Sequence, residues 1–237
     1  MPSTRTKFKL LLLLLIGGWL LWLGAWVEPQ KLEVVHTQAA LPGWPVDAKP
    51  VRIALLGDIH ATKWDAARLD RIVQATLQEE PEAVFLLGDF CFTTGKHRFS
   101  MPPQEVAQHF APLAKRCPVY FVPGNHDYFL ETLCLTRHLK AAGCIPLNSR
   151  RDFVHVFTNG CAATLRGAPF VPEKDKATAL LPRFSPSRGG KPGRPLISVA
   201  HNPYHFMKVK LAGDLVLSGH THGGQICLHG GRPFLPF

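Results

Sequence analysis

Acidic residues are scarce in this sequence. Only 17 Asp and Glu stand against 27 Lys and Arg, which gives a formal net charge of +10. Part of the excess lies at Arg5, Lys7 and Lys9, and much of the rest lies between Arg150 and Arg194. Such a basic surface fits nucleic acid, anionic lipid headgroups or a diphosphate substrate, and it equally fits a solvated face without a partner. Charge alone leaves these alternatives open.

Cysteine is also scarce, and its spacing argues against one kind of site. None of the six cysteines forms a C-x-x-C pair, so a structural zinc site is not expected. Several lie in or beside apolar runs, as buried free thiols do. A disulfide between Cys134 and Cys144, which flank a predicted helix, stays open. The compartment is therefore not indicated by cysteine usage.

Charge is absent from Leu10–Val27, an apolar stretch that is long enough to cross the hydrocarbon core as a helix. Tryptophans cluster in its second half, as in an interfacial aromatic belt. The basic flank, residues 1–9, favours a cytoplasmic N-terminus. We therefore predict an uncleaved single-pass anchor in a bacterial inner membrane, with the catalytic domain on the periplasmic side. The rival interpretation is a cleaved signal peptide, although the small-x-small cleavage pattern is poor near Trp26.

The remainder of the chain indicates one α/β domain. Residues 28–50 are rich in proline and predict a linker, followed by a domain over 51–237. Apolar runs predict strands at Val51–Leu56, Ala83–Leu87 and Val119–Val122. Helical spacing predicts helices before Pro81, through Val106–Leu113 and over Leu130–Ala142. This alternation is typical of a parallel sheet. Shorter strands are predicted at Phe153–Phe157, Ala162–Leu165, Leu196–Ala200, Leu215–Leu217 and Gln225–Leu228.

Motifs with metal-binding side chains directly follow most of these strands. They are Asp58-Ile59-His60, Gly88-Asp89, Gly124-Asn125-His126-Asp127, His201 and Gly219-His220-Thr221-His222. Because the carboxyl ends of parallel strands meet at one edge of a sheet, we expect these side chains to gather there. Carboxylate, imidazole and carboxamide groups together bind divalent cations. Manganese is the first expectation, with iron and zinc as alternatives.

Such a set suits hydrolysis by two metal ions. The two cations, about 3.5–4 Å apart, need an oxygen ligand in common, and Asp89, isolated after its own strand, is the expected bridge. A water that bridges both cations loses a proton readily, and the hydroxide can attack phosphorus in line. We expect His126 to protonate the leaving oxygen, and Asp127 to hold the His126 ring by a hydrogen bond.

The ordered motifs resemble the calcineurin-like metallophosphoesterase superfamily, whose pattern is D-x-H, G-D, G-N-H-D/E, H and G-H-x-H. The resemblance implies a four-layer α/β sandwich, two mixed β-sheets flanked by helices, preceded here by one transmembrane helix. It also implies two metal ions. The implied ligands are Asp58, His60, Asp89 and His222 for one metal, and Asp89, Asn125, His201 and His220 for the other. Residues 217–226, with Ala200–Pro203, are similar to the YaeI-like bacterial phosphodiesterases.

Three features depart from the family pattern. The second motif usually continues G-D-x-x-D, whereas here Gly88-Asp89 is followed by Phe90-Cys91-Phe92. Many relatives carry Asp where this chain has Tyr204. Similar proteins also continue further beyond Gly223-Gly224-Gln225-Ile226, so we expect the domain to lack its last C-terminal strands.

We therefore predict a membrane-anchored phosphodiesterase or pyrophosphatase. Some relatives hydrolyse UDP-2,3-diacylglucosamine in lipid A synthesis, which makes a lipid-linked nucleotide one candidate substrate. A nuclease or nucleotide phosphodiesterase is an alternative, and so is an inactive binding module, although every ligand is present. The oligomeric state is not indicated. The other histidines are expected to be structural, with His205 the one competitor of His201: His36, His97, His109, His138, His155, His205 and His229.

Overall fold

The computed structural model of the 237-residue chain describes residues 3–93, 98–128, 132–147, 151–168, 190–191, 193–204, 213–222, 227–228 and 232–233. The chain divides into two compact units, Met1–Thr37 and Gln38–Phe237. The second unit begins before residue 51, because Trp44 packs edge-on against Phe157 at a centroid distance of 5.5 Å. The later part of the predicted linker therefore contributes to the domain.

The N-terminal unit consists mainly of one long helix. Helix α1 (Thr4–Trp22) continues through a π-helical turn η1 (Leu23–Val27) and a 3-10 turn η2 (Glu28–Gln30). It begins earlier than the predicted apolar segment, because the Ser3 hydroxyl caps it by accepting a hydrogen bond from Thr6 N. The most apolar 18-residue window within Thr4–Val27 has a mean hydropathy of 2.3, and none of its residues is buried. By length and composition this helix could span a membrane.

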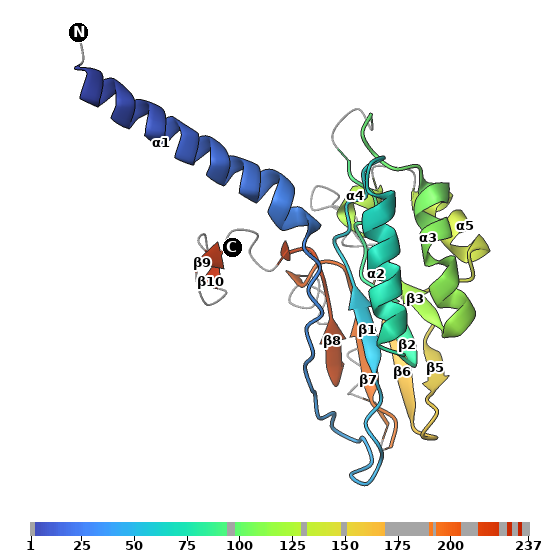
Figure 1. Cartoon of the computed structure of the whole chain (residues 1–237). Coiled ribbons are helices and arrows are strands. Elements are labelled where there is room, and N and C mark those ends of the chain that lie inside the picture. The colour runs from blue at the N-terminus through green and yellow to red at the C-terminus, as the bar shows by residue number, and fades with distance from the viewer. Residues whose placement is uncertain are drawn as a thin grey trace. The chain divides into compact units, whose positions relative to one another are not determined.

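The first sheet of the second unit is parallel throughout its described strands, in the order β1-β2-β3-β4. Figure 1 labels the first three of these strands. These strands are Ile53–Leu56, Ala83–Leu86, Val119–Phe121 and Ile145–Pro146. The connecting helices are α2 (Ala66–Gln78), α3 (Pro103–Arg116), α4 (Asn125–Tyr128) and α5 (Thr132–Ala141). The three predicted strands and three predicted helices are confirmed. The short elements α4 and β4 were not predicted, because two to four residues are too few to show periodicity.

The second sheet is mixed, in the order β5-β6-β7-β8. Its strands are Phe153–Val156, Ala162–Gly167, Leu196–Val199 and Leu215–Leu217. Strand β5 is antiparallel to β6, and the other pairs are parallel. A separate antiparallel pair is formed by β9 (Cys227–Leu228) and β10 (Arg232–Pro233). Four of the five shorter predicted strands are thus confirmed, and of the fifth, Gln225–Leu228, the structure describes Cys227–Leu228 as β9 while residues 225–226 lie outside the described residues.

The predicted architecture of two sheets flanked by helices is confirmed, with one difference. Only the second sheet is mixed, since the described strands of the first are all parallel. Residues 169–189 and 205–212 lie outside the described residues, as do His97, His205 and His229. Much of the basic segment between Arg150 and Arg194 lies outside them too. Cys134 and Cys144 are free thiols.

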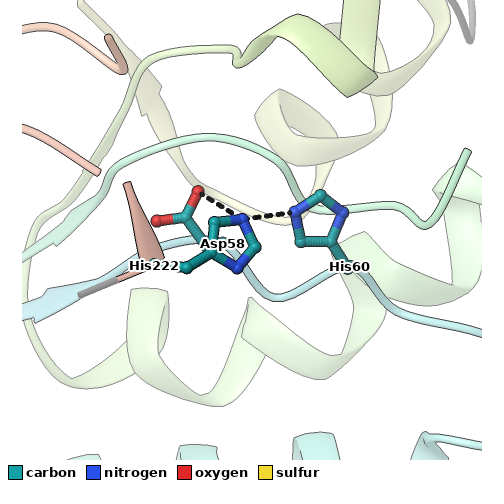
Figure 2. Close-up of side chains that lie close together, drawn as sticks. All are labelled: Asp58, His60 and His222. Atoms are coloured by element: carbon teal, nitrogen blue, oxygen red, sulfur yellow. Dashed lines mark hydrogen bonds and ion pairs between the residues drawn. The ribbon is translucent and has the colours of Figure 1, made fainter. Parts of the chain in front are cut away.

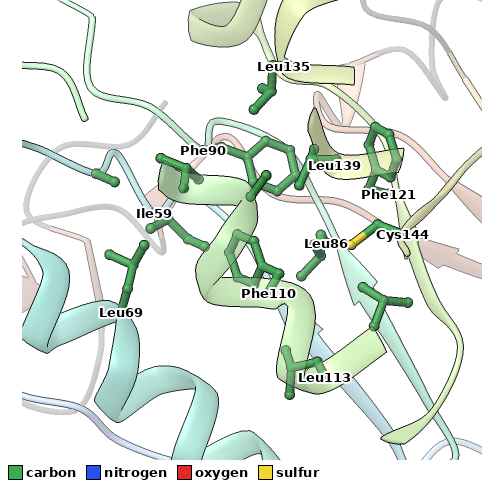
Figure 3. Packing of buried hydrophobic residues seen from close by; sticks show 14 of the residues in the cluster. Ile59, Leu69, Leu86, Phe90, Phe110, Leu113, Phe121, Leu135, Leu139 and Cys144 are labelled. Carbon is green, nitrogen blue, oxygen red and sulfur yellow. The ribbon is translucent and has the colours of Figure 1, made fainter. Parts of the chain in front are cut away.

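Strand alternation divides the core into two layers. In β2, Val84 and Leu86 pack with the helices, as Figure 3 shows for the helix-side cluster. Ala83 and Phe85 point the other way and pack in an inter-sheet cluster with residues of the second sheet, such as Leu165. Each fully buried aliphatic or aromatic side chain contributes about 1.5–3 kcal/mol. The first sheet is therefore fixed on both faces.

One polar pair lies within the inter-sheet layer. The Tyr120 hydroxyl and His155 Nδ1 are 2.9 Å apart, and both residues are buried. A buried polar atom needs such a partner, because an unpaired one costs about 1–3 kcal/mol. The structural role predicted for His155 is confirmed.

Candidate two-metal active site

The predicted ligands all follow the carboxyl ends of strands. Asp58 and His60 follow β1, Asp89 follows β2, Asn125 opens α4 after β3, His201 follows β7, and His220 and His222 follow β8. Backbone hydrogen bonds continue the strand pairing beyond these ends, from Asp58 N to Gly88 O, from His60 N to Asp89 O, and from Gly219 N to His201 O. The two sheets thus present their ligand-bearing ends at one edge.

The backbone at these ends is strained in a consistent way. Six described residues other than glycine have a positive φ, and five of them are predicted ligands: Asp58 (52°), His60 (46°), Asp89 (54°), His220 (75°) and His222 (50°). A left-handed conformation costs roughly 1–2 kcal/mol for a residue with a Cβ. Such strain persists only where surrounding contacts impose it, and it concentrates at functional sites.

Two motif glycines allow the strand ends to approach each other. A Cβ on Gly124 would lie 2.5 Å from Asp89 N and closer still to Asp89 Oδ1. Gly88 has a φ of +95°, and a Cβ there would lie 2.6 Å from Gly124 N and 2.9 Å from His201 Nδ1. The glycines of the G-D and G-N-H-D motifs are therefore needed for close backbone contact around Asp89.

A first group of ligands consists of Asp58, His60 and His222 (Figure 2). His222 Nε2 lies 3.1 Å from His60 Nε2 and 3.7 Å from Asp58 Oδ1. The carboxylate of Asp58 is oriented by His220 N, which is 2.9 Å from each of its oxygens. One atom from each of the three residues converges within 4.8 Å of the others.

A second group consists of Asp89, His201 and His220, with Asn125 beside it. His201 is buried, and its Nδ1 lies 2.8 Å from the Leu87 carbonyl oxygen, to which an Nδ1–H donates. Its Nε2 then faces Asn125 Oδ1 at 2.9 Å and His220 Nδ1 at 3.2 Å. The Leu87 carbonyl thus orients a side chain of the site, as outer partners of metal-binding histidines do.

Asp89 joins the two groups. Its Oδ2 lies 3.6 Å from His60 Nε2 in the first group and 3.2 Å from His201 Nε2 in the second. Its Oδ1 accepts a hydrogen bond from His126 N at 2.8 Å. One carboxylate oxygen therefore lies between two sets of ligand atoms.

The electrostatics of the site favour the forms that bind cations. Burial lowers the pKa of His60 to about 4 despite the nearby Asp89 carboxylate. Burial, together with His201, also lowers the pKa of His220. Burial alone would raise the pKa of Asp89, but the hydrogen bond and charge of His201 hold it below its usual value. At neutral pH the site thus offers neutral imidazoles at His60 and His220 beside the ionised carboxylate of Asp89.

The geometry around His201 Nε2 fits a bound cation. With Nδ1 donating to Leu87 O, Nε2 of the neutral ring carries only a lone pair. It faces two oxygen acceptors, Asn125 Oδ1 at 2.9 Å and Asp89 Oδ2 at 3.2 Å. Asp89 raises the pKa of His201 against the effect of burial, and so favours protonation of the ring. Protonation of Nε2, however, supplies only one hydrogen for the two oxygen acceptors. The lone pairs of His201, Asn125 and Asp89 thus point toward one another, and a divalent cation bound between them would accept all three.

Asp127 and His126 lie at the same edge, and the contacts of Asp127 differ from the prediction. Asp127 is fully buried, and its carboxylate accepts hydrogen bonds from the backbone N–H groups of Gly124, Asp89, Phe90 and Cys91. Burial nevertheless raises the pKa of Asp127 to about 6. The described partner of the His126 ring is Thr93, whose Oγ1 contacts Nδ1. We therefore revise the predicted Asp127–His126 hydrogen bond, because the Asp127 oxygens bind the backbone.

All nine residues predicted for the site thus lie at one edge. Sequence reasoning missed Thr93 and the Leu87 carbonyl. Thr93 stands four residues after Asp89 and belongs to no motif, and a backbone carbonyl carries no signal in sequence. Only their contacts with His126 and His201 reveal them.

Comparison with known proteins agrees with this geometry. The family model for calcineurin-like phosphoesterases matches residues 51–224, which include every residue of the site. The chain belongs to the calcineurin-like phosphoesterase family. This family membership makes it a metal-dependent phosphoric ester hydrolase.

Relatives of this phosphoesterase include membrane proteins. It is 26% identical over 216 residues to phosphodiesterase YaeI of Escherichia coli, covering 88% of this chain and 74% of YaeI. It is also 26% identical over 211 residues to a bovine transmembrane protein with a metallophosphoesterase domain. That match covers 83% of this chain but 46% of the bovine protein, so the chain spans less than half of that relative. A crystal structure of Pseudomonas putida nuclease MPE matches 62% of this chain and 59% of its own, with 17% identity and a TM-score of 0.32, from which we conclude nothing further.

Proposed function

We propose that this phosphoesterase cleaves phosphodiester or pyrophosphate bonds with two divalent cations, which Asp89 bridges. Asp58, His60 and His222 would complete one site, and Asn125, His201 and His220 the other. The observation that carries the proposal is the position of Asp89 Oδ2, 3.6 Å from His60 Nε2 and 3.2 Å from His201 Nε2. Manganese is the first candidate, because mixed oxygen and imidazole ligands accept manganese, iron or zinc.

The chemistry follows from which groups the site holds. Two bound cations would supply Lewis acidity and a water of lowered pKa. His126, held to Asp89 through its backbone N–H at 2.8 Å, stands beside both ligand groups and would give a proton to the leaving oxygen. Asp127 would fix the loop that carries Asp89 by binding three of its N–H groups. The position of Asp89 would thus depend on the buried Asp127 carboxylate, which accepts hydrogen bonds from the backbone and does not contact the substrate.

We further propose that α1 anchors the protein in the bacterial inner membrane. Residues Leu10–Val27 of α1 and η1 carry no charge, and Arg5, Lys7 and Lys9 near the start of α1 favour a cytoplasmic N-terminus. The domain would then lie on the periplasmic side. An anchored hydrolase with an excess of positive charge suits an amphiphilic, phosphorylated substrate, of which a lipid-linked nucleotide such as UDP-2,3-diacylglucosamine is one example.

The test is turnover by the full chain in detergent micelles with manganese. Bis-p-nitrophenyl phosphate and p-nitrophenyl phosphate report diester and monoester cleavage. We expect diester turnover that Asp89→Asn abolishes and that Asp70→Asn leaves intact. Asp70 is the matched control because its side chain is 67% exposed on α2, where it pairs with His109. Absence of turnover from folded, metal-loaded wild type would contradict the proposal.

The substrate class is tested by competition. UDP-2,3-diacylglucosamine and single-stranded DNA are each added to the diester assay at increasing concentration. We expect the amphiphile to inhibit and be cleaved, with DNA without effect at physiological salt. Cleavage of DNA, with binding that weakens steeply as salt rises, would point instead to a nuclease.

A further inference from the structure

Arg68 on helix α2 contacts the segment that carries two of the ligands. Its Nη2 donates a hydrogen bond to the Ile59 carbonyl oxygen at 2.7 Å, and its side chain is only 21% exposed. Ile59 lies between Asp58 and His60, which both belong to the first group of ligands. We propose that Arg68 is a positioning residue of this group, because it fixes the peptide that joins Ile59 to His60. This inference rests on the two-metal site proposed above.

The peptide between Ile59 and His60 is held at both of its polar groups. Arg68 binds its carbonyl oxygen, and its N–H, which belongs to His60, donates to Asp89 O at 2.9 Å. In a trans peptide these two groups point in opposite directions, so the two hydrogen bonds together hold the plane against rotation. The orientation of this plane sets φ of His60, which is +46°, a value that residues with a Cβ rarely adopt. The contact with Arg68 therefore helps to maintain the strained backbone of a ligand.

The direction of the hydrogen bond from Arg68 is fixed by chemistry. A guanidinium only donates and stays charged in proteins, and a carbonyl oxygen only accepts. The guanidinium is itself held, because its Nε donates to Asp65 Oδ1 at 3.0 Å. Burial would raise the pKa of Asp65, but hydrogen bonds from Arg68 and Thr62 hold it below its usual value. Arg68 thus joins an ionised carboxylate to the Ile59 carbonyl oxygen.

Asp65 extends this contact to the next part of the loop. It occupies the N-cap position of α2, but its carboxylate turns back toward the loop. Its Oδ2 accepts hydrogen bonds from Thr62 N at 2.8 Å and from Thr62 Oγ1 at 2.6 Å. The Ile59 side chain packs with Leu69 of α2 in the helix-side cluster (Figure 3). The start of α2 therefore holds residues 59–62 through polar and apolar contacts together.

The two groups of ligands should depend on Arg68 to different extents. The first group takes two of its ligands from the segment that Arg68 holds, whereas Asn125, His201 and His220 follow other strands. Loss of Arg68 should let the peptide before His60 rotate, and so weaken the ion of the first group. The ion of the second group should stay bound. A merely structural role would instead lower the stability of the whole domain and affect both ions alike.

The test is manganese binding by the full chain in detergent micelles. Arg68→Met keeps the length of the side chain but donates no hydrogen bond. We expect affinity for one ion to fall about 10–100-fold and affinity for the other to stay within about threefold, as for loss of one outer contact of a metal site. Arg68→Lys should resemble Arg68→Met, because one ammonium cannot hold both Ile59 O and Asp65 as the planar guanidinium does. Arg71→Met, which changes an exposed arginine of the same helix, should bind both ions as wild type does.

A second set of variants identifies the ion that depends on Arg68. His222→Ala removes a ligand of the first group, so adding Arg68→Met should not weaken the ion that remains. His201→Ala removes a ligand of the second group, so adding Arg68→Met should weaken the remaining ion about 10–100-fold. Equal weakening of both ions, unchanged binding by Arg68→Met, or wild-type affinity in Arg68→Lys would overturn the proposal.

A readout that needs no metal is amide hydrogen exchange in the metal-free chain. In Arg68→Met the His60 N–H should exchange about tenfold faster, because its bond to Asp89 O opens when the peptide rotates. The amides of β1, Ile53–Leu56, should keep the wild-type rate. An unchanged rate at His60, or an equal acceleration throughout β1, would overturn the positioning role. If wild type binds no manganese or cleaves no diester, the proposed hydrolysis fails, while this exchange still decides the role of Arg68.

Discussion

The two sheets supply different halves of one site. The first, parallel sheet supplies its oxygen ligands, Asp58, Asp89 and Asn125, together with His60. The second, mixed sheet supplies imidazoles only, from His201, His220 and His222. Each group of ligand atoms draws on both sheets, so neither sheet alone holds a complete site. The layer between the sheets therefore joins the two halves of the site, whereas the layer under the helices packs against the first sheet and not the second. Four predictions test this difference, from the largest effect to the smallest.

Removing an imidazole that the second sheet supplies should reduce diester turnover as much as removing a carboxylate that the first sheet supplies. We expect His201→Ala to lower diester turnover by about 10³-fold or more, or about 4 kcal/mol in the barrier. It should also reduce bound manganese from two ions to one, because Nε2 of His201 faces only the Asp89–Asn125 side. Metal analysis and kcat/KM measure both effects. His138→Ala, on α5, is the matched control, and normal turnover by His201→Ala would contradict the assignment.

Separating the strand ends of the first sheet should have the next largest effect. A Cβ on Gly124 would fall 2.5 Å from Asp89 N, so Gly124→Ala must push the Asp89 loop away. We expect metal affinity to fall about 10–100-fold, as for loss of an outer contact of a metal site. Titration with manganese measures this change. Gly18→Ala, where an added Cβ meets nothing within 4 Å, should leave affinity as it is.

A matched pair of leucines distinguishes the two core layers. Leu113 on α3 lies in the helix-side cluster and Leu165 on β6 lies between the sheets, and each is 0% exposed. We expect either Leu→Ala change to cost about 2–5 kcal/mol in the free energy of unfolding. Only Leu165→Ala should also weaken manganese binding, by about tenfold, because the second sheet shifts against the first. Equal metal affinity in both variants would refute a special role for the inter-sheet layer.

The smallest expected effect is a pH dependence from the same layer. Burial lowers the pKa of His155 from its ordinary 6.5, against a weaker opposing effect of Glu82. Between the lowered pKa of His155 in the folded chain and pH 6.5, the unfolded chain binds this proton to a greater extent than the folded chain does. The contribution of His155 to the free energy of unfolding is therefore complete above pH 6.5, and it is lost as the pH falls below that value. Denaturation of the metal-free chain at several pH values should show a shallower slope for His155→Gln, and an identical slope would contradict the prediction.

Much of the fold could be predicted because its signals are local. The apolar runs at Val51–Leu56, Ala83–Leu87 and Val119–Val122 became β1, β2 and β3 within one or two residues. The elements α4 and β4 were missed since they are too short for periodicity. The parallel character of the first sheet's described strands was also predicted, because strands and helices alternate along residues 51–142.

The amino-acid sequence alone indicates which carboxylates, imidazoles and glycines the site contains, and that these residues follow strands. These depend on residue type and spacing. The tertiary structure decided how they are used, because contacts across the two sheets place Asp89 between two ligand groups. Contacts likewise commit Asp127 to backbone N–H groups and bring Thr93 to His126. A side chain's partner is a property of packing, so residue type limits it and only the fold selects it.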